Sequence, residues 1–502
     1  MLSGTYFVVL AAINLKYHIV GDYGVETDFF WSYVPQAKHV LEGTLTIEDF
    51  HGPLYPIILA LVGLVTKDFF HAGVLLATFA AATTLFFVFE LFKRLFRADT
   101  ALIAALIVGA NTTFVQYAYS AGTDMLFNAF VTGGVFFLFL DEERSWKTLC
   151  ISTLLFALCY LTRYNGVFVL LGVPAAIVIG NHWHLDRKER WKTTAIFAGL
   201  FLAMIAPWGI YCWIEKGSFF YNRNYLNIAY EMFAKGKMGW DQYWSVESQK
   251  FASLTQVVFA DPGLFISTLA GNVAEHLVND LDKLLGWHLG VFSVVGLVLS
   301  FKQKPAARVI GFGLLCVAFF LVLLLVFYGE RFSMFLLPFY IALALQPLAH
   351  PSLARMKLWN RIQVGALIAL GLVVWTGSKS YSFNKENIRS GPQEMIAIAD
   401  WCDRNLDNSE RGKNIFARKP HIAYYLRMQM QGFPYVNTYP ELVDAMKSQN
   451  ASYVYFSLME AAMRPQFQNL LDPRNAPKEL LPITFTAYPP AVLYKVRLDS
   501  LQ

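Results

Sequence analysis

The stretch PLYPIILALVGLV, residues 53–65, is apolar but too short to cross a bilayer as a helix. A membrane-spanning helix needs about 20 mostly apolar residues. The stretch also begins with prolines at positions 53 and 56, and a helix accepts proline readily only in its first turn. We therefore predict a re-entrant or interfacial helix that is packed against other parts of a membrane protein.

The composition on either side also indicates a membrane protein. The 502 residues are 56% hydrophobic and only 15% charged, whereas soluble domains carry about 25% charged residues. The N-terminal run lacks a basic segment and a small-residue cleavage site, so it is interpreted as a retained first span. Ten further apolar runs are candidate spans: 70–92, 99–118, 122–140, 147–162, 165–180, 193–214, 286–301, 308–327, 332–349 and 361–378. The sequence thus predicts a mainly α, polytopic protein with about 11 transmembrane helices plus the re-entrant helix.

The charges of the connecting loops predict an orientation. With the N-terminus inside, the cytoplasmic loops contain FKRLFR, DEERSWK, HLDRKERWK, FKQKPAAR and ARMKLWNR, each with at least two basic residues. The short outer loops YSAG, TRYNG and YGERF carry at most one each. This distribution follows the positive-inside rule. It predicts a multi-pass protein of the plasma (inner) membrane.

Two domains are predicted. Residues 1–379 form the transmembrane domain, with outer loops at 21–69 and 215–285. Residues 380–502 alternate helical and strand patterns and end in a probable hairpin, PITFTAYPPAVLYKVRL, which indicates a small α/β domain. Because the span count places it outside, this domain is expected to be extracytoplasmic, or periplasmic. It has no Gly-rich phosphate loop, so we assign it no catalytic role.

Ionisable side chains gather at the predicted outer ends of the apolar runs. Such residues are costly at membrane depth and are therefore functional candidates. They are Glu26, Asp28, His51, Asp124, Arg163, Glu330 and Arg331. Since the predicted topology places them on one face of the membrane, acids and bases from separate segments could converge there.

Each candidate also has a structural interpretation. Asp124 would be an ordinary helix N-cap, and this interpretation has about even odds against a functional role. Arg163 and Arg331 would extend to lipid phosphates, and His51 would be a loop histidine. The aromatic run Phe29–Trp31 would be an interfacial belt. The gathering on one face favours a functional site more strongly than any single residue does.

The sequence gives little support for a metal or cofactor. Asp280 and Asp282 form a D-x-D, but carboxylates two residues apart on a helix point to different faces. We interpret them as a solvated helix face. No Cys/His spacing fits zinc, and no disulfide framework is implied. No metal ligands are assigned and no cofactor is required, although a divalent metal is left open.

Several pieces, taken in order, resemble a known family. They are TDFFWSYVPQAKHVLEG (27–43), HGPLYPIILALVG (51–63), AGTDMLFNAFVTGGVFFLF (121–139), LTRYNGVFVLLGVPA (161–175) and ERFSMFLLPFYIAL (330–343). They resemble the polytopic C-type (GT-C) glycosyltransferases that use polyprenyl-phosphate sugars. The similarity is to the bacterial protein O-mannosyltransferase and lipid A aminoarabinose-transferase group, and it covers nearly the whole chain.

The resemblance implies roles for particular residues. Asp28 matches the acidic residue that acts at the acceptor, and Asp124 matches the family's second acidic position. Two positions depart from the family pattern. Phe29 stands where a glutamate often follows the aspartate. His51 and Gly52 stand where the aminoarabinose branch often has a lysine.

The implied enzyme is a cell-envelope glycosyltransferase of the hexosyl or pentosyl type. A polyprenyl-phosphate sugar is its donor, and a lipid, glycan or protein hydroxyl in the bilayer environment is its acceptor; no nucleic acid is involved. Direct displacement would invert the anomeric centre, with Asp28 as the base. The residues expected to bind substrate are Arg163, Arg331, Glu330, His51, Tyr55 and Glu26.

Two other classes compete with this hypothesis. A transporter or lipid flippase would show paired halves with broken helices, yet only one re-entrant segment is predicted. A membrane scaffold would not need acids and bases at one depth. The sequence leaves the sugar, the acceptor, the carrier length and the oligomeric state open.

Overall fold

Two compact units make up the computed structural model, which describes residues 1–358 and 362–497. The helical unit comprises Met1–Lys16 and Gln36–Glu386, and the sheet unit comprises Tyr17–Pro35 and Asn387–Gln502. The sheet unit therefore includes the segment Tyr17–Pro35, most of which the sequence analysis assigned to the first outer loop of the transmembrane domain. Each unit has its own core.

The first half of the helical unit contains the predicted short helix. The helices up to residue 216 are α1 (Leu2–Tyr17), α2 (Val34–Leu41), α3 (Leu54–Thr66), α4 (Phe69–Leu95), α5 (Ala98–Ala110), α6 (Thr112–Tyr119), α7 (Asp124–Leu138), α8 (Trp146–Thr162), η2 (Tyr164–Phe168), α9 (Val169–Ala175), η3 (Ala176–Gly180) and α10 (Arg187–Lys216). The short apolar stretch after Pro53 forms α3. This helix has 13 residues, so it is too short to span a bilayer.

The second half continues the bundle. Its helices are α11 (Tyr225–Ala229), η4 (Tyr230–Ala234), α12 (Trp240–Val246), α13 (Leu254–Ala260), α14 (Pro262–Asn279), η5 (Asp280–Leu284), α15 (Trp287–Ser300), α16 (Ala307–Leu323), η6 (Met334–Leu336), α17 (Leu337–Leu345), η7 (Pro347–Ala349), α18 (Pro351–Ala354) and α19 (Val364–Arg389). A two-stranded hairpin, β1 (Lys357–Leu358) and β2 (Ile362–Gln363), precedes α19.

The count of about 11 transmembrane helices is not confirmed. Among the described residues, three helical segments are long and apolar enough to cross a membrane: Phe69–Leu95, Arg187–Lys216 and Val364–Asn405. Two bent pairs, Ala98–Tyr119 and Leu254–Leu284, raise the number to 5 if each is one span. Six of the other predicted runs form apolar helices of 10–17 residues, and the first predicted span forms α1, which has 16 residues.

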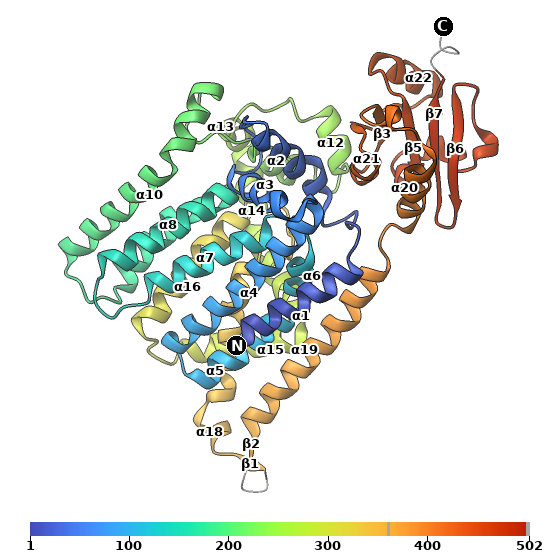
Figure 1. Ribbon diagram of the computed structural model, residues 1–502. Helices are drawn as coiled ribbons and strands as arrows, with labels where there is room; N and C mark the ends of the chain where they lie inside the picture. The colour runs from blue at the N-terminus through green and yellow to red at the C-terminus, as the bar shows by residue number, and fades with distance from the viewer. Residues whose placement is uncertain (359–361, 498–502) are drawn as a thin grey trace. The chain divides into compact units, whose positions relative to one another are not determined.

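Helix α7 is packed between α4 and α8, and the three run side by side (Figure 1). Two small residues of α7 make this packing close. A Cβ on Gly133 would lie 2.8 Å from the Phe87 ring, and one on Gly134 would lie 2.7 Å from the Phe156 ring. The Ser152 hydroxyl donates to the Gly134 carbonyl at 2.7 Å. These contacts fix α7 relative to α8, and so they fix where the N-terminus of α7 meets the C-terminus of α8.

The sheet unit has the α/β organisation expected from the sequence. Its elements are α20 (Gln393–Asn405), β3 (Asn414–Ala417), α21 (His421–Leu426), β4 (Gln429–Gly432), α22 (Tyr439–Ser448), β5 (Tyr453–Ser457), α23 (Leu458–Met463), β6 (Leu480–Ala487) and β7 (Pro490–Val496). The strand order is β4-β3-β5-β7-β6, with β3 parallel to both β4 and β5, and β7 antiparallel to both β5 and β6 (Figure 1). The expected terminal hairpin is β6–β7, whereas β4 was not anticipated.

Residues 17–35 are part of the sheet unit's packing. The Phe30 ring lies 4.5 Å from the His421 ring. The hydroxyls of Tyr23 and Tyr455 are 3.4 Å apart, and Lys419 Nζ donates to Thr27 Oγ1 at 2.8 Å. Aromatic burial and these hydrogen bonds together tie the segment to α21 and β5.

The stability of the sheet unit is expected to fall in mild acid through His421. This fully buried histidine donates from Nε2 to the Asp22 carbonyl at 3.0 Å. Burial lowers the pKa of His421 from its ordinary value of 6.5 to about 3. In the unfolded chain His421 binds a proton near pH 6.5, whereas in the folded chain it does so only near pH 3. The free energy of unfolding therefore decreases as the pH falls from 6.5 towards 3. The slope is at most about 1.4 kcal/mol per pH unit.

The check is the midpoint of thermal unfolding between pH 7 and pH 4. His421→Gln keeps a donor for the Asp22 carbonyl and cannot titrate, so its midpoint should fall less steeply than that of the wild type. Parallel pH profiles for the two proteins would contradict the assignment.

Candidate functional site

Asp124 and Arg163 form an ion pair where α7 begins and α8 ends. Arg163 Nη1 lies 2.5 Å from Asp124 Oδ1 and 3.2 Å from Thr123 Oγ1. Asp124 is 9% exposed and Arg163 is 19% exposed. The N-cap position of α7 is Thr123, whose side chain makes no capping hydrogen bond, and Asp124 is the first residue of the helix. The pairing with Arg163 thus replaces the simple N-cap interpretation of Asp124.

A second arginine, Arg331, lies against the same aromatic ring as Arg163. The guanidinium carbons of Arg163 and Arg331 lie 5.5 Å and 4.8 Å from the centroid of the Phe332 ring. The Tyr117 hydroxyl interacts electrostatically with Arg331, Asp124, Arg163 and Glu330. The helical unit therefore brings together four of the residues selected from the sequence. Two cations and two carboxylates around two aromatic rings form a polar cluster at the ends of apolar helices.

His51 lies in the segment that leads into α3, next to the end of α8. A Cβ on Gly52 would lie 2.0 Å from the carbonyl oxygen of Leu161, two residues before Arg163. His51 is buried, with Nε2 3.2 Å from Gln36 Nε2 and Nδ1 3.1 Å from the Gly52 carbonyl. Tyr55, another residue expected to bind substrate, is fully buried in α3. Substrate contacts by His51 and Tyr55 stay predictions.

Replacing Gly52 by alanine should disturb this junction. The added methyl group would have to displace the backbone at Leu161, and overpacking of this kind costs about 1–3 kcal/mol. The midpoint of thermal unfolding is expected to fall, and activity with it, because Arg163 follows directly. Gly199→Ala is the matched control, since a Cβ at that position of α10 meets nothing within 4 Å. Equal midpoints for the two variants would show that the close approach is unimportant.

Asp28 and Glu26 belong to the sheet unit and differ in exposure. Asp28 is exposed and directly precedes the π turn η1 (Phe29–Tyr33). Glu26 is fully buried, 3.0 Å from His18 Nε2, and accepts from the Asp22 backbone N–H at 2.8 Å. Glu26 is thus a supporting charge for the loop and not a solvated one. Its predicted contact with substrate is untested.

The aromatic residues after Asp28 do not form the expected interfacial belt. Phe29 and Phe30 are buried within the sheet unit, and only Trp31 is exposed, at 56%. A local sequence pattern does not distinguish buried aromatic residues from interfacial ones here, because Phe30 packs on His421, nearly four hundred residues away. The burial of two rings fixes the backbone that carries Asp28.

Sequence reasoning also misplaced Asp280. It was interpreted as part of a solvated helix face, yet it is fully buried in η5. The Tyr340 hydroxyl donates to Asp280 Oδ2 at 2.8 Å, and Ser333 and Tyr328 lie near the same carboxylate. These groups lie about 50–60 residues further along the chain, so no local pattern could reveal them. The hydrogen bond from Tyr340 joins η5 to α17.

Within residues 1–358 and 362–497, no group of three or more His, Cys, Asp or Glu side chains is arranged to hold a metal ion.

Comparisons with known proteins place this geometry in context. Residues 50–211 match the family model for dolichyl-phosphate-mannose-protein mannosyltransferase. That segment contains His51, Tyr55, Asp124 and Arg163. No curated protein sequence matches the chain.

Solved structures share the fold at low identity. The archaeal oligosaccharyltransferase AglB from Archaeoglobus fulgidus, in complex with an inhibitory peptide and a dolichol-phosphate, is 13% identical with a TM-score of 0.58, and the match covers 91% of this chain and 69% of that chain. ArnT from Cupriavidus metallidurans bound to undecaprenyl phosphate is 13% identical with a TM-score of 0.55, and the match covers 97% of each chain. ArnT in the apo state is 12% identical with a TM-score of 0.58, and the match covers 99% of this chain and 98% of that chain.

These findings confirm the resemblance inferred from the sequence. The structural matches establish the fold over most of the chain, and the family match covers the part that carries the Asp124–Arg163 pair. Residues 50–211 are therefore similar to the dolichyl-phosphate-mannose-protein mannosyltransferase family, and the chain shares the fold of AglB and ArnT over most of its length.

Proposed function

We propose that this protein is an integral membrane glycosyltransferase that moves a sugar from a polyprenyl-phosphate donor to an acceptor hydroxyl. The reaction takes place at the outer face of the plasma (inner) membrane, where the sheet unit is extracytoplasmic. The observation that carries the proposal is the cluster of Arg163 and Arg331 with Asp124 and Glu330 in the helical unit. Relatives by fold were solved with dolichol-phosphate and with undecaprenyl phosphate, which supports the donor class.

The arginines bind the donor phosphate. A guanidinium presents its N–H groups in a planar fork that matches phosphate oxygens. Arg163 is held in place by Asp124 and by the Thr123 hydroxyl, so it is oriented before the donor arrives. Arg331 is ordered against the Phe332 ring. Preorganised positive charge stabilises the negative charge that develops on the leaving phosphate.

The chemistry is a direct displacement. The acceptor oxygen attacks the anomeric carbon, and the bond from that carbon to the phosphate oxygen breaks with its electron pair going to the phosphate. Asp28 takes the proton of the acceptor hydroxyl as a general base. The leaving polyprenyl phosphate is a weak base and needs no proton. Attack from the opposite side inverts the anomeric centre.

A transfer assay in reconstituted vesicles tests the proposal against the alternative. Radiolabelled polyprenyl-phosphate sugars are added with membrane lipids, glycans or peptides as acceptors. The transferase proposal expects the label to become covalently attached to an acceptor as free polyprenyl phosphate accumulates. A transporter or flippase would move the donor between leaflets with the sugar–phosphate bond intact, and that result would overturn the proposal.

A further inference from the structure

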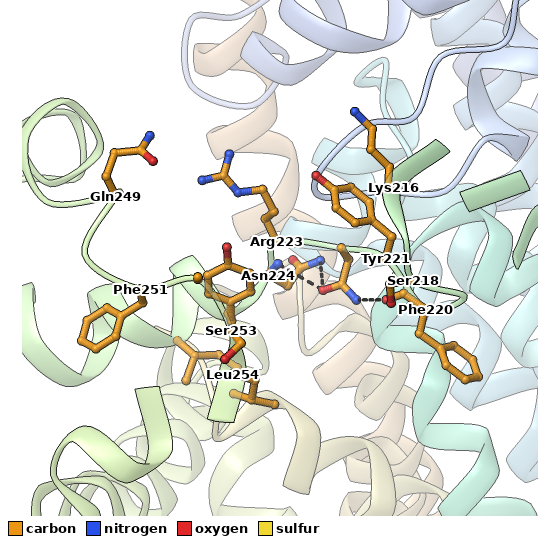
Figure 2. Close-up of a pocket in the computed structure, with 14 residues that line it drawn as sticks. Lys216, Ser218, Phe220, Tyr221, Arg223, Asn224, Gln249, Phe251, Ser253 and Leu254 are labelled. Carbon is orange, nitrogen blue, oxygen red and sulfur yellow. Dashed lines mark hydrogen bonds between the residues drawn. The ribbon is translucent and has the colours of Figure 1, made fainter. Parts of the chain in front are cut away.

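A cavity of about 740 Å³ lies in the helical unit, beyond the C-terminus of α10. Two segments of the long loop between α10 and α14 form its wall (Figure 2). Its lining residues are Lys216, Ser218, Phe220, Tyr221, Asn222, Arg223, Asn224, Tyr225, Ile228, Gln249, Phe251, Ala252, Ser253 and Leu254. Figure 2 shows Gln249 on one side of an open space, with Arg223 and Lys216 on the other.

The lining combines positive charge with neutral hydrogen-bonding groups and aromatic rings. None of these residues is acidic. Arg223 forms an ion pair with Asp49, whose Oδ2 lies 3.2 Å from Arg223 Nη1. Asp49 Oδ1 also accepts a hydrogen bond from the Tyr221 hydroxyl at 2.8 Å. Lys216 lies over the Tyr221 ring, with Nζ 5.8 Å from the centroid. Glu48 interacts electrostatically with Lys216, but no ion pair joins them among the described residues.

Two contacts connect the cavity lining to the segments next to His51 and Arg163. Asn224 Nδ2 donates to the Phe50 carbonyl at 3.3 Å, one residue before His51. The ring of Phe220 packs edge-on against Tyr160 at 6.5 Å, and Tyr160 precedes Arg163 by about one turn at the end of α8. One lining residue is therefore in contact with the last turn of α8, and Arg163 directly follows that helix.

We propose that this cavity is the acceptor site, and that it takes a carbohydrate bearing a carboxylate or phosphate group. The inference rests on the proposed transferase function. Carboxamide and hydroxyl side chains such as Asn222, Gln249 and Ser253 suit sugar hydroxyls. The aromatic faces suit the apolar faces of sugar rings. Lys216 and Arg223 provide the charge that an acidic sugar requires, and the volume is in the range of ligand sites.

The test measures binding to the full-length protein in lipid nanodiscs. The probes are tri-galacturonic acid, mannotriose 6-phosphate, neutral mannotriose and inorganic phosphate. At least one acidic trisaccharide is expected to bind at least tenfold more tightly than neutral mannotriose. Equal binding of acidic and neutral probes, or no binding of any trisaccharide, would overturn the proposal. Inorganic phosphate binding as tightly as mannotriose 6-phosphate would overturn its carbohydrate part.

Variants assign the binding to this cavity. Lys216→Gln should weaken the acidic trisaccharide about tenfold and leave neutral mannotriose unchanged. Lys237→Gln removes an exposed lysine of the same loop that does not line the cavity, and it should have no effect. Equal affinities for the two variants would place the binding elsewhere and overturn the assignment.

A donor measurement separates this inference from the proposed function. Lys216→Gln should bind undecaprenyl phosphate as the wild type does. If the wild type bound acidic sugars but no polyprenyl phosphate, the proposed function would fail while the sugar site stood. If it bound polyprenyl phosphate but no acidic sugar, the acceptor inference alone would fail.

Discussion

Asp28→Asn is expected to lower the rate of sugar transfer by about 10²–10⁴-fold, which is the contribution of a positioned general base. Asparagine is nearly isosteric with aspartate but does not accept a proton at neutral pH. Asp28 is exposed, so the change leaves the buried packing of Phe29 and Phe30 intact. Folding and binding of polyprenyl phosphate should be unchanged. Single-turnover transfer from a radiolabelled donor measures the effect.

Asp400→Asn is the matched control. Asp400 is an exposed carboxylate on α20 of the same unit, and transfer by this variant should equal that of the wild type. Wild-type rates with Asp28→Asn would remove Asp28 from the mechanism. If Asp28→Asn were partly unfolded at the assay temperature, and the lost folded fraction accounted for the lost rate, the defect would be structural. That result would also count against Asp28 as the base.

Arg163→Gln is expected to weaken polyprenyl-phosphate binding by about 10–100-fold. Hydrogen bonds to charged groups contribute about 1.5–3 kcal/mol, and each 1.4 kcal/mol is a factor of ten in affinity. The same change leaves Asp124, 9% exposed, without its cation. A buried polar group that loses its partner costs about 1–3 kcal/mol, so stability should fall as well.

A double variant separates the two effects. Asp124→Asn combined with Arg163→Gln removes both charges, and the midpoint of thermal unfolding should recover towards the wild type. Donor binding should remain weak if Arg163 contacts the phosphate. Recovery of donor binding together with stability would show that Arg163 acts only on Asp124. Arg97→Gln is the matched control, because Arg97 is 83% exposed at the N-cap of α5 and is not a member of the cluster.

The sequence anticipated those parts of the fold that depend on local patterns. Apolar runs predicted α4 and α10, and the short run with its two prolines predicted α3. Alternating patterns predicted β5 and the final hairpin of β6 and β7. The predicted number of spans is not confirmed because several apolar runs are broken by bends, such as the 63° bend between α5 and α6 at Asn111.

Contacts between distant segments were beyond the reach of sequence patterns. Asp124 and Arg163 are 39 residues apart, and only the packing of α7 on α8 brings them together. Phe30 packs on His421, nearly four hundred residues away, so an interfacial belt was the natural expectation from the local sequence. Asp280 was misplaced for the same reason, because the Tyr340 hydroxyl that it accepts from is 60 residues away.

The central claim is that sugar leaves a polyprenyl phosphate and is attached to an acceptor in a step that depends on Asp28. The most direct measurement reconstitutes the wild type and Asp28→Asn in vesicles with a donor labelled in both the sugar and the polyprenyl chain. The account predicts that the wild type separates the two labels, with the sugar on an acceptor in inverted configuration, and that Asp28→Asn keeps them together. Both labels staying together with the wild type, or separating equally fast with Asp28→Asn, would contradict it.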